Sequence, residues 1–436
     1  MLLFKRAIEL DPEFAFAYAY LGRSYADSGE QNLAVESIGQ AYRLRGIASD
    51  KENFFITYNY DREVLRNFEL CREVCESWSA RYPRDYVPHG FLSGLTSQGT
   101  AQYEKAIQEG EEAIVLAPDF TIGYQNIAEA NLHLGRPEAA VKALQRASRR
   151  KLPSSDALWV QFLAAFLNRD RSAMARKSAE LAGASPYGDS EYLNSLVFAY
   201  EGRLQESRQA SIQAVTLARQ AHMAERAALF EGASAMSEAL YGYSSETSTH
   251  AAGASQLSRG RDTDFPPAFA LALCGNSSTA LIMATHFEKQ YPEDTCVRFT
   301  YLPAVRGLVE MNQGNAARTI EILTASKPYE LAQTGVSLYA HYGSAIYSTY
   351  VRGLAYQKLH RNLEAAAEFQ RMLDHPGLLL ADPIGPAARL QLARSLRDAG
   401  ETAKAKAAYQ DFLTLWKDAD PDIRLLRQAK AEFAHL

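Results

Sequence analysis

Between Tyr124 and Ala147 the sequence reads YQNIAEANLHLGRPEAAVKALQRA, and this stretch decides the fold. Apolar residues recur every three or four positions on both sides of Gly135, which is the spacing of an amphipathic helix. Gly135 interrupts the pattern at a point where a helix would end. The stretch therefore predicts two amphipathic helices joined by a short turn.

The same unit occurs at 18–41, which reads YAYLGRSYADSGEQNLAVESIGQA. Its aromatic, apolar, glycine and small residues stand at the same offsets as those of the first unit. Five turns along the chain share a central glycine, and the residue five positions later is small or short and β-branched: Ala34, Ala140, Ser207, Thr319 and Ala405. Small side chains there let the second helix pack closely on the first.

These offsets resemble the tetratricopeptide (TPR) pattern, a helix–turn–helix repeat of about 34 residues. Partial units continue at 353–369 and 392–409. The resemblance implies an all-α fold, a right-handed TPR α-solenoid. We expect one continuous superhelix in three parts: clear repeats at 1–151, degenerate helix pairs at 152–345, and clear repeats with a capping helix at 346–436.

The turns predict a lone helix at 2–10, a lone helix at 422–434, and eleven pairs between them: 15–28/31–44, 50–66/67–81, 86–98/101–116, 120–133/137–151, 155–168/170–183, 190–201/204–219, 222–241/246–258, 264–274/278–290, 296–312/315–325, 338–359/362–374 and 385–398/401–417. The composition of 242–264 and 375–386 also favours longer loops there. Each pair is expected to contact only its sequence neighbours. Helix 2–10 reads as the second half of a repeat, so we expect the sequence to come from a longer array or from a longer protein.

Composition excludes several classes of protein. The 436 residues carry a net charge of −5, which argues against a nucleic-acid-binding protein. The longest apolar stretch is far shorter than the ~18–20 residues of a membrane-spanning helix, and no signal peptide begins the chain. We therefore expect a cytoplasmic protein with no membrane insertion.

No motif for catalysis, cofactor binding or metal binding stands out, so we expect a protein that is not an enzyme and holds no cofactor or metal. The sequence 418–422 starts like a calcium loop but lacks the required glycine at its sixth position, Ile423. Cys71 and Cys75 fall at packing positions of one helix, which favours a place in the core. His133 is expected to be a solvated surface histidine, with contact to a ligand as the alternative.

The segments 369–377, 382–385 and 408–422 resemble the C-terminal TPR region of bacterial eukaryotic-like serine/threonine protein kinases of the Acidobacteria type, and 7–45 fits the same pattern. In that family a kinase domain precedes the array. Here the Gly-rich loop, HRD and DFG motifs are absent, so the resemblance implies a regulatory or partner-binding region and no kinase activity.

The pattern favours a scaffold that binds a protein or peptide on the concave side of the superhelix; a regulatory region of a kinase signalling protein is the alternative. The oligomeric state stays open. First helices line the concave side, and their inner positions hold Phe16, Arg23, Asp27, Ile122, Gln125, Glu129, His133, Tyr347, Tyr350, Arg394 and Arg397. Tyrosines crowd 339–350, where they either fill aromatic slots of the repeat or offer contacts to a partner.

Overall fold

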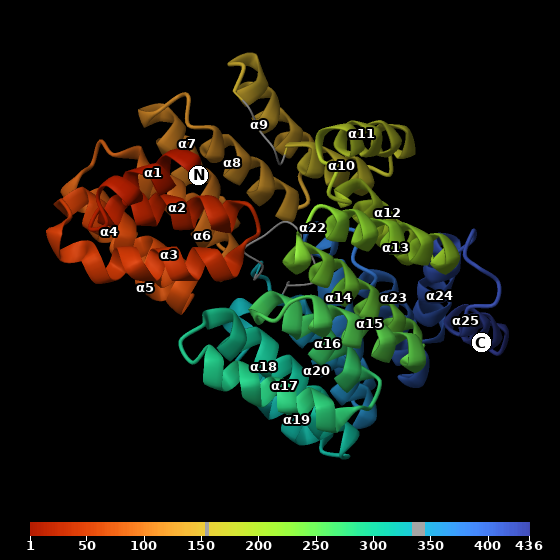
Figure 1. Ribbon diagram of the computed structural model, residues 1–436. Helices are drawn as coiled ribbons and strands as arrows, with labels where there is room; N and C mark the ends of the chain where they lie inside the picture. The colour runs from red at the N-terminus through yellow and green to blue at the C-terminus, as the bar shows by residue number, and fades with distance from the viewer. Residues whose placement is uncertain (153–156, 334–344) are drawn as a thin grey trace.

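A computed structural model describes residues 1–152, 157–333 and 345–436, apart from the side chains of residues 96–98. Its helices follow one another in pairs (Figure 1). The first half contains α1 (Leu2–Leu10), α2 (Ala15–Asp27), α3 (Gln31–Leu44), α4 (Asp50–Tyr60), α5 (Phe68–Arg81), α6 (Tyr86–Thr100), α7 (Tyr103–Leu116), α8 (Thr121–His133), α9 (Pro137–Arg149), α10 (Ala157–Leu167), α11 (Arg171–Ala184), α12 (Asp189–Tyr200) and α13 (Leu204–Gln220).

The second half contains α14 (Ala224–Tyr241), α15 (Ser244–Leu257), α16 (Arg261–Leu273), α17 (Ser277–Gln290), α18 (Leu302–Asn312), α19 (Ala316–Thr324), α20 (Ile346–Lys358), α21 (Asn362–Leu373), α22 (Pro376–Leu379), α23 (Ile384–Asp398), α24 (Thr402–Leu415) and α25 (Arg424–Ala434). Short 3₁₀ or π turns lie at Arg45–Ile47, Asp61–Leu65, Val297–Tyr301 and Lys327–Tyr329. No β-strand occurs in the described ranges. The predicted fold class, an all-α TPR solenoid, is confirmed, and residues 338–344 of one predicted helix lie outside the described residues.

The two helices of a pair approach closely because small residues meet at their crossing. A Cβ placed on Gly22 of α2 would lie 2.5 Å from Ile38 Cγ1 and 3.0 Å from the Ala34 carbonyl oxygen on α3. Ala34 and Ala140 are fully buried at equivalent places in their pairs. Gly135, in the turn between α8 and α9, has φ +70°, which explains why the repeat needs glycine there.

Ala140→Trp is expected to lower the free energy of unfolding by about 1–3 kcal/mol, because the ring must enter the contact between α8 and α9. Urea unfolding followed by circular dichroism measures the change. Ala139→Trp, on a half-buried neighbour in the same helix, is the control. Equal stabilities of the two variants would show that the helix crossing does not lie at Ala140.

The helix predicted at 246–258 is confirmed by α15, and the longer loop that composition favours at 242–264 is wrong, because α15 fills most of it and α16 begins at Arg261. Hydroxyl groups that suggest turns in the sequence instead donate to carbonyls one helical turn earlier. Thr247 donates to Tyr243, and Ser248 donates to Ser244. This bonding lets serine and threonine sit within a helix. The predicted loop at 375–386 likewise contains the short helix α22.

The expectation that pairs contact only their sequence neighbours is wrong for this chain. The Phe68 amide donates to Thr295 Oγ1, 227 residues along the chain, and the Thr295 amide donates to the Arg66 carbonyl. The Trp416 indole donates to the Tyr200 carbonyl, 216 residues away, and α23 contacts both α12 and α14. Figure 1 shows the blue helices α23 and α24 behind the green helices α12–α15. The superhelix is therefore wound so tightly that its second turn rests on its first.

One hydrophobic cluster runs through most of the protein, from Tyr58 to Ala429. A smaller cluster at the N-terminal end includes Ala15, Phe55 and Trp78. Because the large cluster joins both superhelical turns, the two turns share a core. Across the described part of the chain, no helix combines the length and apolar character needed to cross a membrane.

Candidate functional site

An aromatic strip runs over α1 and over the first helices of the repeats that follow it. Phe4, Phe16, Tyr20 and Phe55 are joined by ring contacts on α1, α2 and α4. Tyr86 and Phe120 form a second ring contact at the starts of α6 and α8, and Tyr86 lies close enough to Tyr20 to affect its pKa. Phe55 is buried, Tyr20 is exposed, and the other four are half-buried. The strip therefore has an inner side that packs on the core and an outer side that faces solvent.

Tyr20 lies at the centre of this strip. Its ring centroid lies 5.4 Å from that of Phe4, 4.7 Å from that of Phe16 and 4.7 Å from that of Phe55. Burial, followed by the nearby Tyr86 and Asp85, raises the pKa of Tyr20 above its ordinary value, so its hydroxyl is neutral at pH 7. Tyr20 is still 37% exposed, which leaves part of a rigid, amphipathic ring open to a partner.

The predicted binding residues of α2 lie in two different environments, an aromatic one around Phe16 and a charged one around Arg23 and Asp27. Phe16 belongs to the aromatic strip. Arg23 forms an ion pair with Asp27 at 2.9 Å and approaches the buried Glu63 at 4.0 Å. Glu63 also accepts a hydrogen bond from the Gln31 side chain, and the Gln31 amide donates to Glu225 on the next superhelical turn. The C-terminal half of α2 is therefore linked to the next superhelical turn through Glu63 and Gln31, whereas its N-terminal half carries the exposed Tyr20.

The predicted binding residues of α8 are similarly divided. Ile122 is 41% exposed, and Gln125 and Glu129 are half-buried. The expectation of a solvated His133 is wrong, because its side chain is buried beside Tyr103, and Nε2 lies 3.4 Å from Gln333 Nε2. Burial lowers the pKa of His133 to about 4, so the ring is neutral at pH 7.

The predicted binding residues near the C-terminus are engaged within the protein. Tyr347 and Tyr350 are buried; the Tyr347 hydroxyl donates to Asp382, and the Tyr350 ring packs edge-on against Phe369. Arg394 pairs with Glu432 of α25 at 2.7 Å, and Arg397 lies 3.4 Å from the same carboxylate. These two arginines hold the last helix against the array. Tyr339 and Tyr342 lie outside the described residues.

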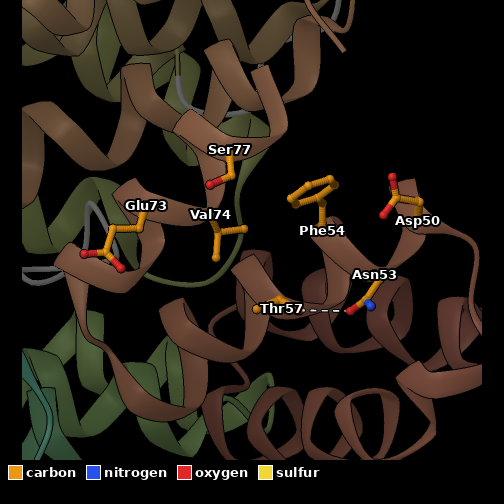
Figure 2. Close-up of a pocket in the computed structure, with 7 residues that line it drawn as sticks. All are labelled: Asp50, Asn53, Phe54, Thr57, Glu73, Val74 and Ser77. Atoms are coloured by element: carbon orange, nitrogen blue, oxygen red, sulfur yellow. Dashed lines mark hydrogen bonds between the residues drawn. The ribbon is translucent and has the colours of Figure 1, made fainter. Parts of the chain in front are cut away.

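A pocket of about 370 Å³ opens between α4 and α5 (Figure 2). Asp50, Asn53, Phe54, Thr57, Glu73, Val74 and Ser77 line it. Figure 2 shows Asp50 and Glu73 at opposite ends, with Phe54 and Val74 between them. The pocket therefore combines apolar walls with acidic ends.

Asp61 lies one helical turn beyond Thr57 and is 5% exposed. Burial, followed by the negative charge of Glu73, raises the pKa of Asp61 to about 7. Among the described residues, no cation forms an ion pair with Asp61 or with Glu73. Glu73 therefore carries a negative charge that no ion pair among these residues compensates, whereas Asp61 holds its proton up to a pH of about 7.

Asp61→Asn is expected to make stability less dependent on pH. The folded protein holds a proton on Asp61 up to a pH of about 7, whereas the unfolded chain releases it near pH ~4. The stabilisation that comes from the raised pKa of Asp61 is therefore complete below pH ~4, the pKa of the unfolded chain. It is lost as the pH rises through about 7, the pKa in the folded protein. Urea unfolding at about pH 5 and about pH 8 measures it. Asp411→Asn, at an exposed site on α24, should leave the difference unchanged; the same result for Asp61→Asn would contradict the assignment.

Other reactive groups are enclosed. Cys71 and Cys75 are fully buried, as predicted for core residues, and burial raises the pKa of both thiols well above the ordinary value. Within the described ranges, no three histidine, cysteine or acidic side chains are grouped so that they could hold a metal ion.

Of the aromatic strip, sequence reasoning found only Phe16 and missed Phe4, Tyr20, Phe55, Tyr86 and Phe120. A signal was available, because Tyr86 and Phe120 occupy equivalent positions one period of about 34 residues apart. The aromatic residues of the strip belong to different helices, so no single stretch of sequence shows them as a group.

No protein-family model matches this chain, and no curated protein matches it. Solved structures that resemble it include a chain of the APC/C hetero-tetramer Cut9–Hcn1, with 12% identity, 98% of this chain and 92% of that chain covered, and a TM-score of 0.40. Yeast Tom70 is 10% identical over 97% of this chain and 96% of its own, with a TM-score of 0.36. PilW, a type IV pilus biogenesis factor, is 18% identical over 43% of this chain and 85% of its own, with a TM-score of 0.33. The assignment to TPR-type solenoids rests on the helix pairs of this chain.

Proposed function

We propose that this protein is a non-catalytic scaffold that binds a peptide segment of a protein partner through the aromatic strip. The observation that carries the proposal is the position of Tyr20, which is surrounded by aromatic rings and still 37% exposed. Tyrosine is enriched at the energetic centres of protein interfaces, because a held ring offers a large contact area at little entropic cost.

The strip favours a partner segment with apolar or aromatic side chains. Exposed apolar residues flank it: Phe14 is 40% exposed before α2, and Ile122 is 41% exposed on α8. Apolar contact surface of this kind is typical of docking sites in soluble proteins. Gln125 and Glu129 are half-buried further along α8 and already interact within the protein, so the proposed surface does not depend on them.

Tyr20→Ala is expected to weaken binding of the partner peptide about tenfold or more, as for a residue at the centre of an interface. Pull-down and mass spectrometry would identify the partner, and calorimetry with its peptide would give the affinity. Tyr187→Ala is the matched control, because Tyr187 is 38% exposed but lies before α12, outside the strip. Equal weakening by both variants would contradict binding through the strip.

The proposal of a regulatory region in a kinase signalling protein rests on the sequence resemblance of 369–377, 382–385 and 408–422. It predicts that the partner peptide comes from a protein kinase or one of its substrates. The same pull-down tests it, because a strip-dependent partner unrelated to phosphorylation would contradict the kinase alternative and leave the scaffold proposal standing.

A further inference from the structure

The pocket between α4 and α5 is a second candidate site, separate from the aromatic strip. Its two acidic ends differ in charge balance. At one end, Asp50 accepts hydrogen bonds from Arg81 Nε at 2.6 Å and from the Tyr82 hydroxyl at 2.8 Å. These two bonds hold the pKa of Asp50 below its ordinary value, and Arg81 neutralises its charge. The Asp50 end therefore attracts no further cation strongly.

The other end is not neutralised. Glu73 is exposed on α5, and Asp61 lies nearby at 5% exposure, with no ion pair to either group in the part of the chain that the structure describes. Asp50, Asn53, Thr57 and Asp61 follow one another at intervals of three or four residues, so they form one stripe along α4 and its continuation. Asp61 is not among the residues that line the pocket, but it lies close enough to Glu73 for the charge of Glu73 to raise its pKa.

The walls between the two ends suit an aliphatic chain. Phe54 and Val74 present carbon atoms from the two helices, and the Phe54 ring is fixed by stacking on Trp78 at a centroid distance of 5.7 Å. Oxygen atoms that can accept hydrogen bonds also line the pocket. The Thr57 hydroxyl donates to Asn53 Oδ1 and keeps its own lone pairs for a donor, and Ser77 adds a second hydroxyl.

We infer that this pocket binds a lysine side chain presented by a basic peptide. The four-carbon stem lies between Phe54 and Val74, and the ammonium group lies at the end formed by Glu73. An ammonium donates three hydrogen bonds in tetrahedral directions, which suits acceptors distributed around the walls. A planar guanidinium is suited instead to paired oxygens in one plane.

Methyl nuclear magnetic resonance of the full chain tests this inference, with the Val74 and Thr57 methyl groups as reporters. The ligand is Nα-acetyl-lysine methylamide, and the matching norleucine and arginine compounds are the comparisons. We expect saturable shifts of both methyl signals with the lysine compound and a weaker response to the other two. A response to norleucine equal to that of lysine would overturn the role of the acidic end, and tighter binding of arginine would overturn the choice of lysine.

Glu73→Gln is expected to raise the dissociation constant of the lysine compound about three- to fivefold, as for the loss of one exposed ion pair. Glu73 is exposed, so the variant should fold normally. Glu112→Gln, which removes the same charge from an exposed site on α7, is the control and should change the constant less than about twofold. Equal effects of the two variants, or no shift of the Val74 signal in the unmodified protein, would overturn the inference. Binding through the aromatic strip is measured separately with Tyr20→Ala, so either site can fail alone.

Discussion

Arg261→Ala is expected to lower the free energy of unfolding by about 3–5 kcal/mol, because it leaves the buried Asp294 carboxylate without its cationic partner and removes one of the two arginines that pair with Asp262. The Arg261 side chain is fully buried and pairs with Asp262 at 2.9 Å and with Asp294 at 3.2 Å. Burial alone would raise the pKa of Asp262, but Arg261 and Arg66 together hold it below its ordinary value. Arg66 comes from the first superhelical turn, so the cluster joins the two turns. Urea unfolding measures the loss.

Arg318→Ala is the control for this prediction. Arg318 pairs with Glu321 on α19, and both side chains are more than 60% exposed (61% and 64%). An exposed pair of this kind contributes less than about 1 kcal/mol. If Arg261→Ala and Arg318→Ala unfolded at the same urea concentration, the buried cluster would not contribute to stability as argued.

Trp416→Ala is expected to cost about 3–5 kcal/mol, the range for removal of a large buried aromatic side chain. Trp416 follows α24 and is 1% exposed. Its indole donates to the Tyr200 carbonyl at 3.0 Å, and its ring packs edge-on against Tyr241 at 5.2 Å. Trp416→Phe keeps most of the apolar contact and loses the hydrogen bond, so it should cost only about 1 kcal/mol.

Hydrogen exchange separates this contact from ordinary packing between neighbouring repeats. Trp416→Ala should speed amide exchange in the turn between α12 and α13, near Gly202, as well as in α24. The reason is that the Gly202 carbonyl accepts a hydrogen bond from the Asp420 amide just beyond Trp416. Faster exchange confined to α24 and α25 would contradict the direct contact between turns.

Much of the fold could be predicted because the repeat is local. The helix pairs depend on apolar spacing within about 34 residues and on small residues such as Ala34 and Ala140 at the crossing. These features can be read from one stretch of sequence at a time. The predicted loop at 242–264 failed because serine and threonine there bond to their own helix, a choice that composition does not reveal.

The candidate site was less predictable because the repeat register says which face of a helix points inward and does not say what lies opposite. His133 and Arg23 occupy register positions of the inner face, yet both are tied to residues about 200 positions away. Gln333 contacts His133 directly. Arg23 is linked to Glu225 through Glu63 and Gln31. Arg394 is likewise engaged by the terminal helix α25. Ile122 stays exposed and Phe16 stays half-buried, because both lie in the N-terminal halves of their helices, away from these contacts.

The contacts between superhelical turns also limit how the array can change in length. In an open solenoid, one repeat can be inserted or deleted with consequences only for its neighbours. Here, deletion of the pair α10–α11 would displace the second turn by one repeat relative to the first, so the contacts between the two turns would lose their register. Phe68 would then no longer face Thr295. The number of pairs within a turn is therefore fixed by the contacts across it, and repeats can be gained or lost without this mismatch only at the two ends.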